Sequence, residues 1–239
     1  MKTQATILAL AAGAGLAGAQ TIDFNALQHG EVVSTQYQAS NGVTINAFNA
    51  NQKFDYAVAF DSSLTGTADP DLEDPWSTGN LPGDTFMGNV LIIQENGIGI
   101  GDGIADVPDD EGGRPAGNIT FGFDRGVTHL GFDVVDLEGF TAELSFIDFY
   151  KDGAFVGVIG FDQFESGGAL DQGAIFGDNS LNRIAPLDLV DLFGVAPDRA
   201  TFLLGGSMAI DNISYRSVPA PASAALMGLG GIACLRRRR

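Results

Sequence analysis

Apolar and polar residues alternate at every second position along much of this chain, a pattern that predicts β-strands. Residues 21–27 and 118–124 alternate in this way, and residues 89–94 form a continuous apolar run typical of a strand covered on both faces. Residues 150–159 predict a hairpin, because Asp152-Gly153 suits a turn that requires positive φ. Further strands are predicted at residues 43–48, 127–137, 142–150, 180–190, 200–204 and 208–215.

Helical periodicity is nearly absent between these strands, and a single helical turn is expected within residues 186–192. The 33 glycines agree with a turn-rich β protein. A set of strands of this kind usually closes as two antiparallel sheets, so the predicted fold is all-β, an antiparallel β-sandwich resembling a jelly roll. No linker rich in Pro or Ser divides residues 20–217, which are therefore expected to form one domain.

The first 19 residues have the three parts of a secretory signal peptide. Lys2 supplies a basic start, an apolar run follows, and Ala17-Gly18-Ala19 offers small residues at a cleavage site. The alternative is a buried N-terminal helix, but no amphipathic period supports it. We expect residues 1–19 to be removed and the mature chain to begin near Gln20.

The last part of the chain predicts a single hydrophobic helix followed by a strong positive charge. Residues 220–235 are uncharged and are followed by Arg236, Arg237, Arg238 and Arg239. A helix of that length would span about 24 Å, slightly less than the ~30 Å core of a bilayer. Because positive residues stay on the cytoplasmic side, we expect the body of the protein to lie outside the inner membrane.

Residues 218–239 together resemble a PEP-CTERM sorting signal. The order is Val218-Pro219-Ala220-Pro221, an apolar helix, and the terminal arginine cluster. The resemblance implies export and processing by an exosortase, an integral-membrane cysteine protease or transpeptidase, with a final location at the cell surface or in the extracellular matrix. The sequence departs from the family at Ala220, where Glu is usual, and a simple membrane anchor is the alternative.

Short pieces of the body are similar to the sandwich domains that PEP-CTERM proteins carry. They occur in the same order along the chain, and the resemblance implies a secreted β-sandwich without implying a reaction. The similar pieces are Ile22-Asp23-Phe24, Ala59-Phe60-Asp61, residues 65–72, residues 89–95 and residues 205–213.

Charge separates the two parts of the chain. The formal net charge of −18 combines 12 basic and 30 acidic residues. Lys2 and the four terminal arginines lie outside the body, which keeps seven basic residues and all 30 acids, a net charge of −23. Such a charge argues against nucleic-acid binding, which needs a basic surface to replace phosphate counterions. The single cysteine, Cys234, lies in the tail, so the exported domain has no disulfide.

Two acidic loops suggest Ca²⁺ as a cofactor, because calcium takes six to eight oxygen ligands and glycines allow backbone carbonyls to turn toward an ion. A separate candidate pairs Asp23 with Asp211, which can meet if the first and last strands are neighbours. The alternatives are solvated acidic loops and, for Asp211, a turn cap. The candidate ligands are Asp69, Asp71 and Asp74 in the first loop, Asp102, Asp106, Asp109 and Asp110 in the second, and the Asp23–Asp211 pair.

Catalytic motifs are not apparent, and we expect no enzyme activity. His29 and His129 have no cysteine near them in the sequence, and no Gly-x-Ser-x-Gly motif occurs. Trp76 lies in a polar loop and is a candidate sugar platform, although a Trp folded over the end of the sandwich is the alternative. The sequence thus favours an exported structural or interaction protein. The alternatives are a carbohydrate-binding module for envelope or matrix polysaccharide and, third, a secreted hydrolase with a carboxylate pair.

Overall fold

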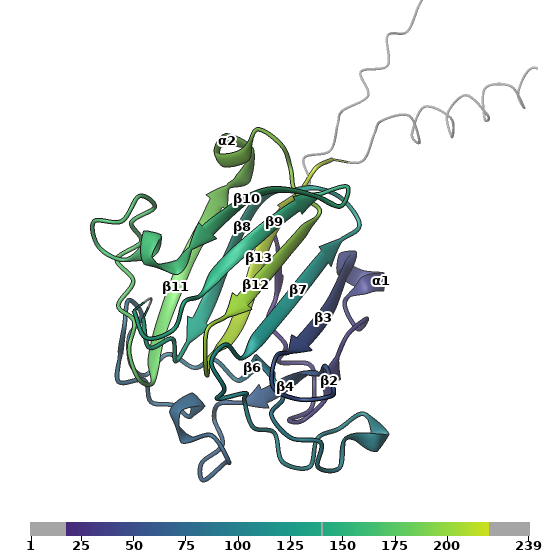
Figure 1. Cartoon of the computed structure of the whole chain (residues 1–239), viewed down its shortest axis with the longest axis vertical. Helices are drawn as coiled ribbons and strands as arrows, with labels where there is room; N and C mark the ends of the chain where they lie inside the picture. The colour runs from purple at the N-terminus through teal and green to yellow at the C-terminus, as the bar shows by residue number, and fades with distance from the viewer. Residues whose placement is uncertain (1–17, 140, 220–239) are drawn as a thin grey trace, which may run out of the picture.

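Two β-sheets face each other in the computed structural model, which describes residues 18–139 and 141–219 (Figure 1). The larger, eight-stranded sheet has the order β2 (Val32–Val33), β4 (Ala57–Asp61), β6 (Asn89–Ile93), β13 (Ala209–Ser217), β8 (Val127–Val135), β11 (Ser180–Asp188) and β5 (Thr78–Gly79), while β1 (Gln20–Ile22) also pairs with β13. The five-stranded sheet has the order β10 (Ala154–Gly160), β9 (Phe146–Lys151), β12 (Arg199–Leu204), β7 (Gly117–Phe123) and β3 (Val43–Asn49).

This arrangement confirms the predicted all-β class with two sheets. The strand pairs are antiparallel except for β11 and β5, which run parallel. The helices are short: α1 (Gln38–Asn41), α2 (Leu189–Phe193), and the 3₁₀ turns Pro70–Leu72, Ile100–Asp102 and Phe161–Phe164. Within residues 18–139 and 141–219, no helix is long and apolar enough to cross a bilayer. Most of the predicted signal peptide and the predicted tail helix lie outside the described residues.

Several element boundaries differ from the sequence prediction. The strand expected at residues 142–150 begins only at Phe146, and the strand expected at residues 180–190 ends at Asp188, where α2 begins. The Asp188 side chain causes this change by accepting hydrogen bonds from the backbone amides of Val190 and Asp191, each at 3.0 Å, and thereby caps the helix. The Asp152–Gly153 hairpin is confirmed, with φ of 49° and 82° at the two turn residues.

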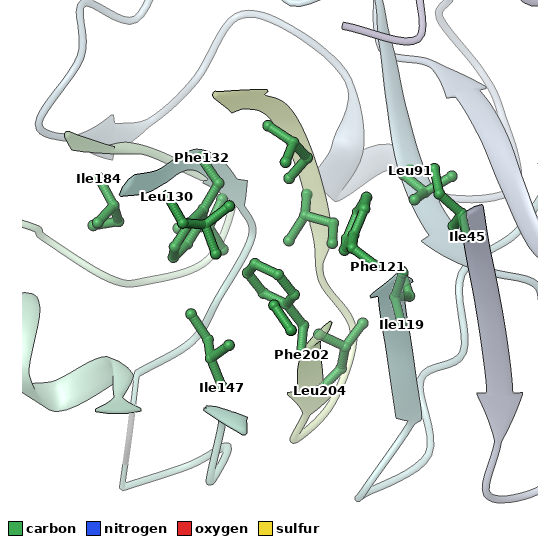
Figure 2. Packing of buried hydrophobic residues seen from close by; sticks show 14 of the residues in the cluster. Ile45, Leu91, Ile119, Phe121, Leu130, Phe132, Ile147, Ile184, Phe202 and Leu204 are labelled. Atoms are coloured by element: carbon green, nitrogen blue, oxygen red, sulfur yellow. The ribbon is translucent and has the colours of Figure 1, made fainter. Parts of the chain in front are cut away.

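The main hydrophobic core lies between the two sheets and is rich in phenylalanine (Figure 2). Strand β7 contributes Ile119, Phe121 and Phe123 by strict alternation, as the sequence predicts. Phe202 of the five-stranded sheet packs edge-on against Phe132 of the eight-stranded sheet, with ring centroids 4.9 Å apart. This contact joins the two layers at the centre of the core.

A second core covers part of the opposite face of the eight-stranded sheet, around β4 and β6. Alternate residues of its strands, such as Val58, Val90 and Ile92, point away from the main core and are fully buried. Loop residues cover them, among them Leu72, Trp76, Met87 and Ala105. Around β4 and β6 the eight-stranded sheet is therefore buried on both faces, which explains the continuous apolar run of β6.

We predict that Phe202→Ala lowers the free energy of unfolding by about 3–5 kcal/mol, because it removes a ring from the interface between the sheets and leaves a cavity. Urea unfolding followed by circular dichroism measures the change. Phe86→Ala is the matched control, since Phe86 is 70% exposed and its loss should change stability by less than about 0.5 kcal/mol. Equal effects of the two substitutions would contradict this description of the core.

Candidate functional site

The two acidic loops converge beside the end of strand β8. The backbone amide of Asp110 donates to Asp69 Oδ2 at 3.4 Å, which brings the second loop against the first. The Ser207 hydroxyl lies 2.8 Å from Asp110 Oδ2 and 3.3 Å from Asp136 Oδ2. Asp136 is a member of this cluster that the sequence prediction missed, because it follows an apolar strand and not an acidic run. We call Asp69, Asp110, Asp136 and Ser207 the acidic loop cluster.

Burial changes the titration of this cluster. Asp136 is only 3% exposed, and burial, with the negative charges of Asp71 and Asp69, raises its pKa to about 8. Burial also raises the pKa of Asp110, and the adjacent Asp69 adds to the rise. The Ser207 hydroxyl has one hydrogen and can donate it to only one of the two carboxyl groups, Asp110 or Asp136. The other can form a hydrogen bond with Ser207 when it carries a proton of its own. Hydrogen bonds thus link the acidic loop cluster, and burial favours the neutral forms of Asp110 and Asp136.

The other predicted loop ligands do not join this cluster. Asp102 is exposed and accepts a hydrogen bond from the Ile104 amide at 3.1 Å, while Asp106 is exposed near Gly99. Asp109 lies beside Glu95, and burial raises the pKa of both carboxyl groups. Asp71 is exposed and Asp74 is half-buried. Among residues 18–139 and 141–219, no group of three or more His, Cys, Asp or Glu side chains is arranged to hold a metal ion.

The predicted pair Asp23 and Asp211 lies at another place in the fold. Strands β1 and β13 are neighbours, with Ile22 opposite Ile213, which is the strand pairing on which the Asp23–Asp211 candidate depends. Asp23 is exposed to solvent, whereas Asp211 is fully buried. Burial raises the pKa of Asp211, and the charges of Asp133 and Asp23 raise it further. Asp133 itself is bound by Arg183, whose Nε and Nη2 lie 2.8 and 2.7 Å from its two oxygens.

The Trp76 side chain is folded into the second core and is 5% exposed. Its indole nitrogen donates to the Thr85 carbonyl oxygen at 2.8 Å, so the ring offers no open face to a sugar.

Neither histidine is placed to act as the general base for a nucleophile. His29 Nδ1 accepts from the Asp61 amide at 3.0 Å, and His129 Nδ1 lies 3.0 Å from the Thr128 hydroxyl. Burial lowers the pKa of His29.

The outer face of the five-stranded sheet carries side chains in rows across the strands. Residues directly opposite one another in antiparallel strands project from the same face. The central row is polar, with the Thr120 and Thr201 hydroxyl oxygens 3.1 Å apart. The rows, each written from β3 to β9, are Phe48–Asn118–Leu203–Phe146, then Asn46–Thr120–Thr201–Asp148, then Thr44–Gly122–Arg199–Tyr150.

One end of this face is hollowed into an apolar groove of about 470 Å³. Phe48, Phe146, Leu144 and Leu203 contribute to its lining, and Phe48 and Leu144 are 52% and 59% exposed. Arg114 lies at the groove and pairs with Glu138. At the other end of the face, the Arg199 guanidinium carbon lies 3.9 Å from the centre of the Tyr150 ring. The sequence analysis missed this groove, because its residues come together only through the register of four strands.

Of the predicted sorting residues, Val218 and Pro219 lie in the described part of the chain. The Val218 amide donates to the Gly126 carbonyl oxygen at 2.7 Å, directly after the last strand. Ala220, Pro221 and Arg236–Arg239 lie outside the described residues.

Comparison with known proteins gives only distant structural likeness. No protein-family model and no curated protein matches the chain. The K2 cleaved adhesin domain of Lys-gingipain is similar at 14% identity and a TM-score of 0.41, covering 84% of this chain and 99% of that domain. A beta-1,2-glucanase from Parabacteroides distasonis is similar at 13% identity and a TM-score of 0.37, covering 84% of this chain and 26% of the glucanase.

We predict that, in the presence of a chelator, the protein loses stability as the pH rises from about 4 to 8. The unfolded chain ionises Asp136 near its ordinary pKa of 3.8, while the folded state holds the proton until a pH of about 8. The two pKa values differ by about four units, and each unit corresponds to about 1.4 kcal/mol, so the total loss is expected to be on the order of 6 kcal/mol. Urea unfolding at several pH values measures it.

Asp136→Asn should flatten this pH dependence, because the amide stays neutral and its oxygen can still accept from the Asn179 backbone amide, which donates to Asp136 Oδ1 at 2.6 Å. The control, Asp84→Asn, removes an equal charge from an exposed position and should keep the wild-type slope. A variant Asp136→Asn with the wild-type slope would show that Asp136 does not titrate in this range.

Proposed function

We propose that this protein is an exported, non-enzymatic interaction protein of the cell surface or extracellular matrix, with a jelly-roll-like sandwich as its body. The outer face of the five-stranded sheet is its binding surface. The observation that carries this proposal is a difference between the sheets: loops cover the apolar outer face of the eight-stranded sheet around β4 and β6, whereas the five-stranded sheet leaves Phe48 and Phe155 more than half exposed. Exposed apolar side chains beside a groove are typical of a surface that contacts a partner.

Export and surface delivery form the second part of this proposal. The signal-peptide pattern of residues 1–19 and the PEP-CTERM resemblance of residues 218–239 support it. The proposed partner is an exosortase-type membrane protease or transpeptidase, and the apolar segment anchors the chain in the inner membrane until it is processed.

We predict that the mature protein recovered from its native cell surface or matrix lacks Arg236–Arg239 and the signal peptide. Intact-mass spectrometry of the purified protein measures both ends at once. Replacement of the four arginines by serine should leave the protein in the inner membrane with its tail, because the positive charges no longer mark the processed segment. A wild-type surface protein that still carries its arginine cluster would contradict the sorting proposal.

Carbohydrate binding is the second candidate function, and the chemistry of the five-stranded face favours it. A sugar ring has apolar C–H faces and polar hydroxyl edges, so it needs both apolar side chains and hydrogen-bonding groups. The groove supplies Phe48 and Phe146, and the neighbouring row supplies Thr120, Thr201 and Asp148. Of the described residues that line the groove, none is an acid, so the groove offers no carboxylate pair for glycoside hydrolysis.

We predict that Phe48→Ala weakens binding to an envelope or matrix polysaccharide at least tenfold, because it removes one of the two rings at the groove. Isothermal titration calorimetry of full-length variants against polysaccharide fractions measures the affinity. Phe86→Ala removes a more exposed ring outside the groove and should bind as the wild type does. Loss of affinity in both variants, or in neither, would count against a sugar site at this groove. Polysaccharide cleavage abolished by a carboxylate substitution would instead identify a hydrolase.

A further inference from the structure

Strand β10 forms an open edge of the five-stranded sheet. Strands β10 and β3 lie at the two edges of this sheet (Figure 1). The edge of β3 is already occupied, since its Ile45 amide donates to the Ser34 carbonyl oxygen at 2.8 Å. Within the described ranges 18–139 and 141–219, the backbone of residues 154–159 has no hydrogen-bond partner other than β9. An edge of this kind is a template for pairing with another strand.

The sequence of β10 has little of the protection that keeps exposed edges from pairing. Edge strands are usually blocked by charged side chains, by proline or by a covering loop. Strand β10 reads Ala-Phe-Val-Gly-Val-Ile-Gly, without a charge or a proline. Its Phe155 and Val158 side chains are 57% and 49% exposed. One register shift between Phe155 and Gly157 interrupts the ladder with β9, so the regular part of the edge begins at Gly157.

The face to which β10 belongs is electrically neutral, although the body of the protein has a net charge of −23. Val158 lies directly opposite Asp148, so it shares the outer face with the rows of side chains described above. Among the outward residues of the five strands, only Arg199 and Asp148 are charged, and their signs are opposite. Two copies of a strongly acidic protein repel each other least where neutral surfaces of this kind meet.

We propose that two copies of this chain associate by antiparallel pairing of their β10 strands. Pairing about a two-fold axis uses the same surface on both copies, so one open edge is sufficient. The pairing satisfies outward backbone groups of β10 and covers Phe155 and Val158. Because the regular part of the edge is short, the interface is small, and we expect a dissociation constant on the order of tens of micromolar.

The association joins the two five-stranded sheets into one continuous sheet with a common outer face. In this one respect the inference rests on the proposed function: a polysaccharide chain that reaches both grooves binds with avidity, because the second groove meets it at a raised effective concentration. Dimerisation itself needs no ligand. It is therefore measured without polysaccharide, and a failure of sugar binding leaves the measurement unaffected.

Sedimentation velocity of the full-length protein measures the association. We expect mostly dimer at about 200 µM and mostly monomer at about 2 µM. Salt should strengthen the dimer, because it screens the repulsion between the acidic bodies. Hydrogen exchange in residues 154–160 should be slower at the higher concentration, since pairing protects the outward amides of β10.

Val158→Lys should weaken the dimer at least tenfold, because pairing brings the added charges of the two copies together. The matched control is Ile98→Lys, which adds the same charge at a 54% exposed position outside the five-stranded sheet and should associate as the wild type does. The proposal is overturned by a wild type that stays monomeric at about 200 µM, or by equal affinities of the Val158→Lys and Ile98→Lys variants. Exchange in residues 154–160 that does not depend on concentration also overturns it, and this measurement decides if Val158→Lys does not fold.

Discussion

The burial of the eight-stranded sheet on both faces around β4 and β6 is the constraint on which the rest of this structure depends. Its inner face packs against the five-stranded sheet through contacts such as Phe132–Phe202, and its outer face lies under loops that contribute Leu72, Trp76 and Met87. The chain thereby buries more apolar surface than two sheets packed face to face would bury without the covering loops. The same loops carry many of the 30 acids, so folding them over an apolar face brings carboxylates into a poorly solvated layer.

The two sheets consequently play different parts. Loops already cover the outside of the eight-stranded sheet around β4 and β6, so the side chains there serve stability and the polar groups there must be satisfied internally. The five-stranded sheet has no such cover over Phe48, and its outer face presents a polar row beside an apolar groove. The proposed binding surface therefore lies on the sheet whose outer apolar side chains, such as Phe48, have no cover.

Local patterns in the sequence were sufficient for the features that depend on neighbouring residues. Alternation identified β7, and the Asp152-Gly153 dipeptide identified the hairpin, because both signals act within a few residues. Strands β2 and β5 have two residues each and exist only through their partners, so no local pattern marked them. Asp136 joined the acidic loop cluster through the end of β8, and the groove formed through register across four strands. These pairings join residues distant in the sequence, which periodicity does not report.

The negative charges of the buried acids in this fold are compensated in different ways, by an ion pair in one place and by protonation in others. Asp133 is paired with a guanidinium that reaches out to solvent, which is a fixed charge pair with a low cost because Arg183 stays half exposed. Asp110 and Asp136 share the Ser207 hydroxyl, and a proton removes one of the charges, which makes that cluster sensitive to pH. Burial, with the charges of Asp133 and Asp23, raises the pKa of Asp211, so this fully buried carboxyl group favours its neutral form.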